Sequence, residues 1–117
     1  AYELYRCDWS SDVCSSDLNA GFFRKFAPEP IPLAIDRFGG EAQRIIALLD
    51  DILGRQRFVA GDKLSIADIA HFGWLWRRQF AEVSVEGAPN VQRYITELEA
   101  RPAFQRGIAR TAALAEG

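Results

Sequence analysis

Few side chains in this sequence have the chemistry to act as nucleophiles, general bases or metal ligands. The only cysteines are Cys7 and Cys14, and the only histidine is His71. A zinc site needs about four nitrogen, sulfur or carboxylate ligands, and a serine nucleophile needs a histidine beside it. No motif places such partners near His71. We therefore predict no metal site and no catalytic residue, and we expect His71 to be a packed or surface side chain.

A carboxylate just before an apolar run is the next candidate for chemistry. Asp68 lies in FVAGDKLSIADIA, residues 58–70, and could be taken for a catalytic acid. The Ser-x-x-Asp spacing favours a capping box instead, with the Ser65 hydroxyl accepting a helix amide and Asp68 accepting the Ser65 amide. Leu64 and Ile69 occupy the positions of a hydrophobic staple. We expect Ser65 and Asp68 to be structural, and Asp68→Ala to cost about 1–2 kcal/mol.

The first eighteen residues have a different character from the rest. The stretch DWSSDVCSSDL, residues 8–18, has no apolar periodicity, and both cysteines lie at or next to it. It could be a natural Ser-rich loop, because Ser and Asp favour turns. Its reverse translation, however, resembles the read-primer arm of a common short-read sequencing adapter, and residues 1–3 resemble another arm of the same adapter. We therefore expect residues 1–18 to be an adapter-derived leader and residues 19–117 to be native.

The composition of residues 19–117 narrows the class of protein. The leader carries a charge of −3 and the whole chain −2, so the remaining 99 residues carry about +1. Near-neutral charge argues against a nucleic-acid partner, and no apolar run approaches the roughly 20 residues of a membrane span. A segment without cysteine is compatible with a cytoplasmic protein. Its length suits a single modest domain.

Apolar residues at helical spacing dominate this segment. Residues 32–54 predict a long helix, with a possible kink at Gly39–Gly40 because glycine weakens helix interiors. Further helices are expected at 66 to about 81, about 89–100, and from 102 onward. A stiff PEPIP connector, residues 28–32, precedes the first of them, and residues 19–27 look like a helix end. No strand pattern is present, so we predict an all-α bundle.

The helix beginning at Ile66 is apolar on most faces. A helix that is hydrophobic nearly all round is expected to lie in a core. Ala67, Ala70 and Gly73 form a line of small residues along which a neighbouring helix could approach closely. The sequence therefore predicts a central, fully packed helix here.

The residues now in hand resemble a known family. FVAGDKLSIADIA, followed by PNVQRYITELEARPAFQRGI, is similar to the C-terminal helical domain of glutathione transferases. FFRKFAPEPIPLAIDRF, residues 22–38, is similar to the bacterial Nu-class branch, whose members reduce disulfides with glutathione. The sequence departs from the family at Gly39–Gly40, His71 and Gly73. The helix that precedes Phe22 in the family is also replaced by the leader, so the bundle is expected to be truncated on its N-terminal side.

The resemblance also implies site residues. Arg37 matches a position that contacts glutathione, and an arginine suits a carboxylate. Trp74 matches an aromatic near the active-site cleft, and Phe22, Phe23 and Arg24 could edge the same cleft. The alternatives are core packing for Trp74, helix-end packing for residues 22–24, and an ordinary solvated arginine at position 37.

In the family, a thioredoxin-like N-terminal domain binds most of the glutathione and activates its thiol. The resemblance therefore implies a fragment of a cytoplasmic, homodimeric, glutathione-dependent transferase or disulfide reductase, inactive by itself. The same helical domain also serves as a non-catalytic interaction module in other assemblies, and an unrelated helical bundle is a third reading. The residues do not decide between enzyme and module.

Overall fold

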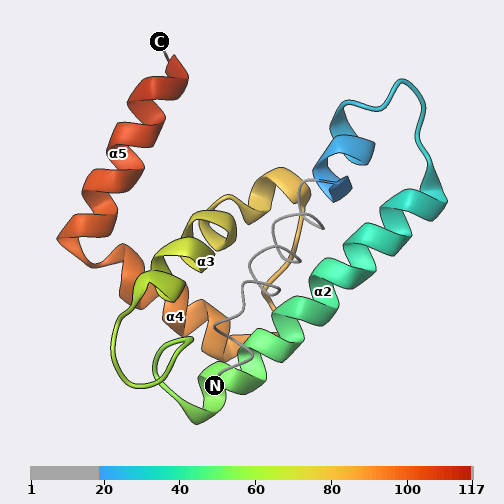
Figure 1. Cartoon of the computed structure of the whole chain (residues 1–117). Helices are drawn as coiled ribbons and strands as arrows, with labels where there is room; N and C mark the ends of the chain where they lie inside the picture. The colour runs from blue at the N-terminus through green and yellow to red at the C-terminus, as the bar shows by residue number, and fades with distance from the viewer. Residues whose placement is uncertain (1–18, 117) are drawn as a thin grey trace.

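The computed structural model describes residues 19–116, and the predicted leader lies outside them. Within the described residues the only β-type pairing is an isolated bridge between Phe58 and Gly61. The elements are a short helix at 19–25, α2 (Pro32–Arg55), α3 (Ile66–Trp76), the 3-10 helix η2 (Arg78–Ala81), α4 (Pro89–Glu99) and α5 (Pro102–Glu116) (Figure 1). The all-α prediction is confirmed.

Helix α2 is the longest element and forms one side of the core. Pro32 occupies its first turn, where the missing amide hydrogen costs nothing. The helix runs through Gly39 and Gly40 to Arg55, so the two glycines do not end it. Its buried stripe is the predicted one over most of its length: Ala42, Ile45, Ile46, Leu49 and Leu53.

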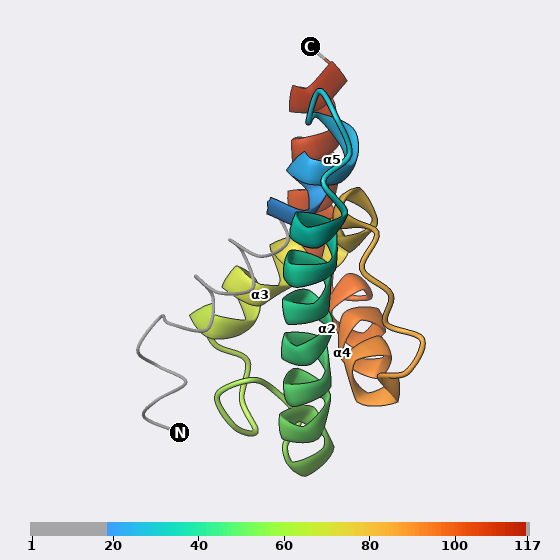
Figure 2. The same cartoon turned by 90° about the vertical axis from the view of Figure 1, so that its right-hand side faces the viewer.

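Helix α4 packs beside α2, and together they hold most of the core (Figure 2). The inward face of α4 is the predicted set, Val91, Tyr94, Ile95 and Leu98. Phe58 and Val59, from the loop after α2, and Phe72 and Leu75, from α3, complete the same apolar cluster. The connection before α3 turns at Gly61, whose φ of 133° suits glycine.

Helix α3 ends five residues before the predicted boundary. It stops at Trp76, and the chain tightens into η2, which ends where Glu82 takes a left-handed conformation with φ 56°. The Val83 amide donates to the Arg78 carbonyl at 3.1 Å, and Arg78 itself donates to the Leu75 carbonyl at 2.8 Å. These bonds satisfy the carbonyl groups at the helix end. Apolar composition alone could not locate that end.

The expectation that α3 is packed on all sides is wrong for one face. Phe72 and Leu75 are buried, but Ile66 is 83% exposed and Ile69 is 59% exposed. The line of small residues is packed only at its start among the described residues. Ala67 lies against the core, but Ala70 and Gly73 are exposed, and a Cβ on Gly73 would meet nothing within 4 Å. Leu64 and Ile69, expected to form a staple, are 36% and 59% exposed.

Helix α5 packs on the bundle only through its first turns. Phe104 and Ile108 lie against the core, and the Phe104 ring meets Phe72 edge to face at 4.8 Å between centroids. Beyond them the helix extends away from the other helices (Figure 1). Leu114, in this outer part, is exposed. Among the described residues, no helix is both long and apolar enough to cross a membrane.

Candidate functional site

The capping box at the start of α3 is present. The Ser65 hydroxyl accepts a hydrogen bond from the Ala67 amide at 3.3 Å, and the Asp68 carboxylate accepts one from the Ser65 amide at 2.8 Å. His71, one turn later, is buried, and its Nδ1 donates to the Ala67 carbonyl at 2.7 Å. The capping box predicted for Ser65 and Asp68 is therefore confirmed, and His71 takes the packed one of the two positions expected for it.

Asp68 also makes two contacts outside its own helix that no local sequence pattern predicts. Its Oδ1 accepts from the Val59 amide at 3.0 Å and from the Tyr94 hydroxyl at 2.8 Å. The side chain is 0% exposed. One carboxylate thus joins the loop after α2, the first turn of α3 and the middle of α4. Since both oxygens are occupied by structural donors, Asp68 has no free oxygen for proton transfer to a substrate.

Tyr94 is held in its neutral form by this arrangement. Burial raises the pKa of the phenol well above its ordinary value, and the hydrogen bond to Asp68 raises it further. A phenol that remains protonated acts here as a permanent donor. The hydrogen bond between Tyr94 and Asp68 therefore has a structural role in the centre of the bundle.

Phe22 and Phe23, two of the predicted pocket residues, lie on the short helix before α2. The Phe23 ring stacks on Phe38 of α2, with centroids 5.7 Å apart and planes 5° apart. Phe22 contacts Phe23 edge to face and is 49% exposed. Phe23 therefore ties the short helix to α2, while Phe22 presents an aromatic surface outward.

Arg24 lies across the gap between the short helix and the loop after η2. Its guanidinium is 3.7 Å from the Glu82 carboxylate. A Cβ on Gly39 would stand 3.1 Å from an Arg24 nitrogen, so the glycine leaves room for the guanidinium. Both residues line a cavity of about 220 Å³ together with Asp36, Gly40 and Gln43. Of the two adjacent glycines, Gly39 thus accommodates the arginine, whereas a Cβ on Gly40 would meet nothing within 4 Å.

Arg37 lies on the first half of α2 and is exposed. Its charge has a small effect on Glu41, whose pKa is lowered chiefly by the hydrogen bond from Arg44 and less by the charges of Arg44 and Arg37. Arg44 is engaged by Glu41 at 2.6 Å. Arg37 thus remains exposed to solvent on this part of α2.

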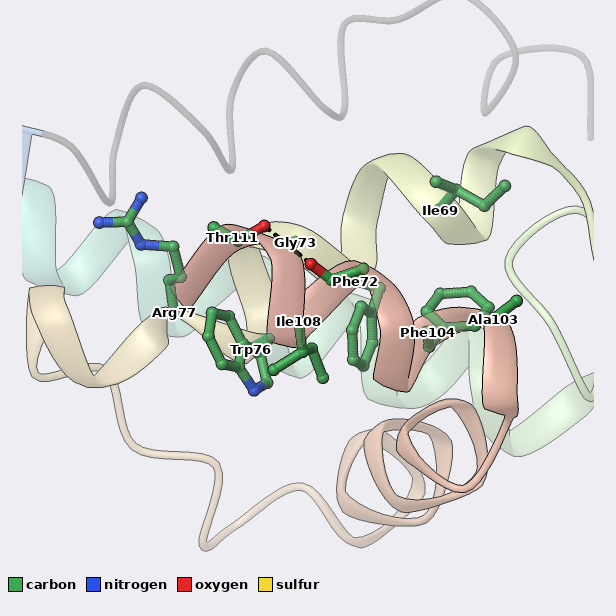
Figure 3. Close-up of a pocket in the computed structure, with 10 residues that line it drawn as sticks. Ile69, Phe72, Gly73, Trp76, Arg77, Ala103, Phe104, Ile108 and Thr111 are labelled. Carbon is green, nitrogen blue, oxygen red and sulfur yellow. Dashed lines mark hydrogen bonds between the residues drawn. The ribbon is translucent and has the colours of Figure 1, made fainter. Parts of the chain in front are cut away.

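A groove of about 360 Å³ runs between α3 and α5 (Figure 3). Its walls are Ile69, Phe72, Gly73, Trp76 and Arg77 on one side and Ala103, Phe104, Gly107, Ile108 and Thr111 on the other. The tryptophan that lines it is Trp76, whereas the predicted Trp74 is half-buried elsewhere on α3. Sequence reasoning missed Trp76 because the apolar pattern on most faces of this helix favoured burial, and the resemblance pointed to Trp74 alone.

The predicted site residues do not share one cavity. Arg24 lines the small polar cavity, Phe22 and Arg37 are exposed on different elements, and the groove is lined by none of them. Residues 22–24 and α2 nevertheless adjoin one another through the Phe23–Phe38 stack. What the described residues offer is an aromatic and basic surface, without a nucleophile or base arranged for catalysis.

A protein-family model matches most of the described residues. The family model "Glutathione S-transferase, C-terminal domain" matches residues 18–102, more than half of the chain. The chain belongs to the glutathione S-transferase family, as its C-terminal domain. The match starts beside the predicted junction between residues 18 and 19, and the origin of residues 1–18 stays a prediction.

Two curated relatives lie in the predicted branch. The chain is 39% identical over 94 residues to the disulfide-bond oxidoreductase YghU of Escherichia coli K12, covering 74% of this chain and 33% of that protein. It is 35% identical over 83 residues to YfcG, a disulfide-bond oxidoreductase of the same organism, covering 69% of this chain and 38% of that protein. This glutathione S-transferase domain thus spans about a third of those relatives.

Solved structures agree on the fold. A glutathione transferase family member from Pseudomonas fluorescens Pf-5, crystallised with two glutathione molecules, matches with a TM-score of 0.82 at 31% identity, over 91% of this chain and 51% of that chain. A glutathione transferase from Burkholderia graminis, also with two glutathione molecules, matches with a TM-score of 0.79 at 33% identity, over 91% and 48%. The prediction of a glutathione transferase C-terminal fold is confirmed.

Proposed function

We propose that this domain belongs to a glutathione-dependent transferase that reduces disulfides. The observation that carries the proposal is the similarity to YghU and YfcG, which are both named as disulfide-bond oxidoreductases. Two solved structures above 30% identity were crystallised with glutathione. Because the chain spans only part of each relative, the activity is proposed for the longer parent protein, and the domain described here supplies surfaces to it.

Arg37 is the proposed glutathione contact of this domain. Glutathione carries two carboxylates, and a guanidinium can bind a carboxylate through two parallel N–H···O bonds. Arg37 is exposed on α2, whereas the nearby Arg44 is held by Glu41. Among residues 19–116, Arg37 forms no ion pair with a carboxylate, which makes it the better candidate for an anionic ligand.

Phe22, Phe23, Arg24 and Trp74 are the proposed edge of the substrate pocket. Phe22 offers an exposed ring, and Phe23 fixes the short helix on α2 by its stack with Phe38. An aromatic edge of this kind suits the apolar part of an electrophile or of a mixed disulfide. In this proposal Arg24 positions the edge through Glu82, since its guanidinium lies in the gap between the two segments.

The chemical step is assigned to the part of the parent that precedes this domain. A thiol reacts as its thiolate, so the site needs a donor or positive charge aimed at the glutathione sulfur. We assign that group to a thioredoxin-like domain, and propose a cytoplasmic homodimer as the working form. The 117-residue chain alone is expected to show neither glutathione conjugation nor disulfide reduction.

Calorimetric titration of glutathione into the parent protein tests the proposal. Arg37→Ala is expected to weaken binding about ten- to hundredfold, the loss of one charge-assisted hydrogen-bonded contact. Arg37→Lys should recover only part of the affinity, because a point charge cannot reproduce the fork. Arg55→Ala is the matched control, since it removes an exposed arginine from the far end of the same helix, where Arg55 pairs with Asp51.

The rival function is a non-catalytic interaction module. A parent that binds no glutathione would favour it, and the enzyme proposal would then fail as a whole. Equal affinity in Arg37→Ala and Arg55→Ala would instead remove only the proposed role of Arg37.

A further inference from the structure

The two glycines inside α2 are not required by the backbone. Gly39 and Gly40 lie in the first half of a continuous helix, and among the described residues the only glycine with a positive φ is Gly61. A glycine in a helix interior costs about 1 kcal/mol relative to alanine. Since alanine would adopt the helical conformation here without strain, the surroundings of each glycine decide whether it has a role.

The surroundings differ between these two neighbours. A Cβ on Gly39 would stand 3.1 Å from a guanidinium nitrogen of Arg24, which is closer than most Cβ contacts in proteins, so the guanidinium would have to shift. A Cβ on Gly40 would meet nothing within 4 Å. Gly39 therefore has a steric role toward Arg24, and Gly40 is a neighbouring position without one.

Arg24 connects two segments across this point of α2. It lies on the short helix at 19–25, and its guanidinium is 3.7 Å from the carboxylate of Glu82, which follows η2. The Arg24 side chain is 23% exposed, whereas that of Glu82 is 62% exposed. Because the arginine is the more buried partner, pushing its guanidinium away from Gly39 would disturb the contact with Glu82.

The short helix is thus held on α2 at two consecutive positions. The Phe23 ring stacks on Phe38 with centroids 5.7 Å apart, and the Arg24 guanidinium lies beside Gly39, the next residue of α2. Phe22 precedes both anchors, meets Phe23 edge to face at 5.4 Å and is 49% exposed. Two anchors fix the rotation of the short helix as well as its position, so together they set the direction in which the Phe22 ring projects.

We propose that Gly39 is a positioning residue for this aromatic edge. By leaving room for Arg24 between the short helix and Glu82, it places the Phe22 ring where it contacts the group bonded to the glutathione sulfur. This inference rests on the proposed function, in which Phe22 edges the substrate pocket. It also separates two contacts, because Arg37 and Gly39 are two residues apart and so face different sides of α2. A change at position 39 should affect the sulfur substituent and leave the glutathione contact of Arg37 intact.

Calorimetric titration of the parent protein with glutathione and with S-benzylglutathione tests the proposal. The benzyl group of this stable thioether stands in for the second half of a disulfide. Gly39→Ala is expected to weaken binding of S-benzylglutathione about three- to tenfold, the range of one aromatic contact, and binding of glutathione less than about twofold. Gly40→Ala is the matched control, since it brings the same gain in helix propensity where a Cβ meets nothing.

A rescue variant tests the steric cause. Arg24→Lys in the Gly39→Ala chain should restore most of the affinity for S-benzylglutathione, because a compact ammonium leaves room for the alanine Cβ and can still pair with Glu82. Urea unfolding of each variant checks that the protein is folded. Absence of this recovery would overturn the proposal, as would equal effects of Gly39→Ala and Gly40→Ala.

The two ligands also separate this inference from the proposed function. Equal weakening of glutathione and S-benzylglutathione by Gly39→Ala would overturn the inference, because a general loss of structure would then explain the result. Unchanged affinity for both ligands in Gly39→Ala would overturn the inference alone. A parent that binds neither ligand would overturn the proposed function and the inference with it.

Discussion

The first turns of α3 and α4 are both held by an aspartate, but the two aspartates come from very different distances along the chain. Asp68 lies within α3 itself, three residues after Ser65. Asp50 lies on α2, and it accepts hydrogen bonds from the amides of Asn90 and Val91 at 2.8 and 3.0 Å. The N-cap of α4 is Ala88, which has no side chain able to accept them. One helix is capped locally and the other by tertiary structure.

The buried aspartate contacts more structural elements than the partly exposed one. Asp68 is fully buried and also holds Val59 and Tyr94, so it fixes the position of α3 against two other elements. Asp50 is half-buried and holds only the first turn of α4. Water can replace a partly exposed acceptor, but it cannot easily reach a buried one. The two aspartates should therefore differ clearly in their contribution to stability.

Replacing Asp68 should have the largest effect. Asp68→Ala removes the cap of α3 and leaves the Val59 amide and the Tyr94 hydroxyl buried without an acceptor. We expect a loss of about 3–5 kcal/mol, from one cap and two unsatisfied donors. This is more than the 1–2 kcal/mol expected for the cap alone. Urea unfolding followed by circular dichroism measures the loss. A loss near 1 kcal/mol would mean that the contacts to Val59 and Tyr94 contribute little.

The two aspartates also mark what the sequence could predict. The spacing from Ser65 to Asp68 is local, so it predicted the capping box, just as the apolar stripe predicted α2. The bond from Asp50 to α4 spans 40 residues. No short pattern encodes it, because it exists only once α2 and α4 lie side by side. The same reason explains why the contacts of Tyr94 with Asp68 went unpredicted.

The candidate site was less predictable than the fold. The all-round apolar pattern of Ile66–Trp76 predicted burial, but a sequence cannot say whether the covering surface belongs to the same bundle. As a result the groove and Trp76 were missed. Trp74 was named from the family resemblance, and its place at the cleft stays a prediction. Arg37 was singled out by resemblance alone, since an exposed helix arginine has no distinguishing local pattern. Its exposure agrees with that role without testing it.

The pH dependence of stability tests the contribution of the buried Asp68, because its carboxylate accepts a hydrogen bond from Tyr94. The pKa of Tyr94 is raised in the folded chain relative to about 10 in the unfolded chain. The neutral phenol therefore stabilises the fold fully below about pH 10, and this contribution falls at higher pH as the unfolded chain ionises. In a chain with Tyr2→Phe and Tyr5→Phe, Tyr94 is the only tyrosine. Its phenolate absorbance should then appear only as the protein unfolds.

Tyr94→Phe is the matched variant for this experiment. It should lower stability at neutral pH by about 1–2 kcal/mol, because Asp68 loses one of its donors. In this variant stability should also fall less at high pH, because no tyrosine at position 94 can ionise in the unfolded chain. Ionisation of Tyr94 in the folded chain near its ordinary pKa would contradict the buried hydrogen bond with Asp68.

Replacing Asp50 should have the smallest effect of the three, and it tests whether a distant residue is truly the cap of α4. Asp50→Ala should cost about 1 kcal/mol, the usual loss for a helix cap. The Asn90 and Val91 amides occupy the second and third helical positions, which an N-cap side chain normally satisfies. Ala88→Ser supplies such a side chain locally. It should therefore stabilise the Asp50→Ala chain by about 1 kcal/mol more than it stabilises the unmodified chain, in a double-mutant cycle from urea unfolding. Any cost of adding a hydroxyl at the buried Ala88 position is common to both backgrounds and cancels. If Ala88→Ser has the same effect in both backgrounds, the two caps do not share the same amides, and the tertiary cap of α4 would have to be abandoned.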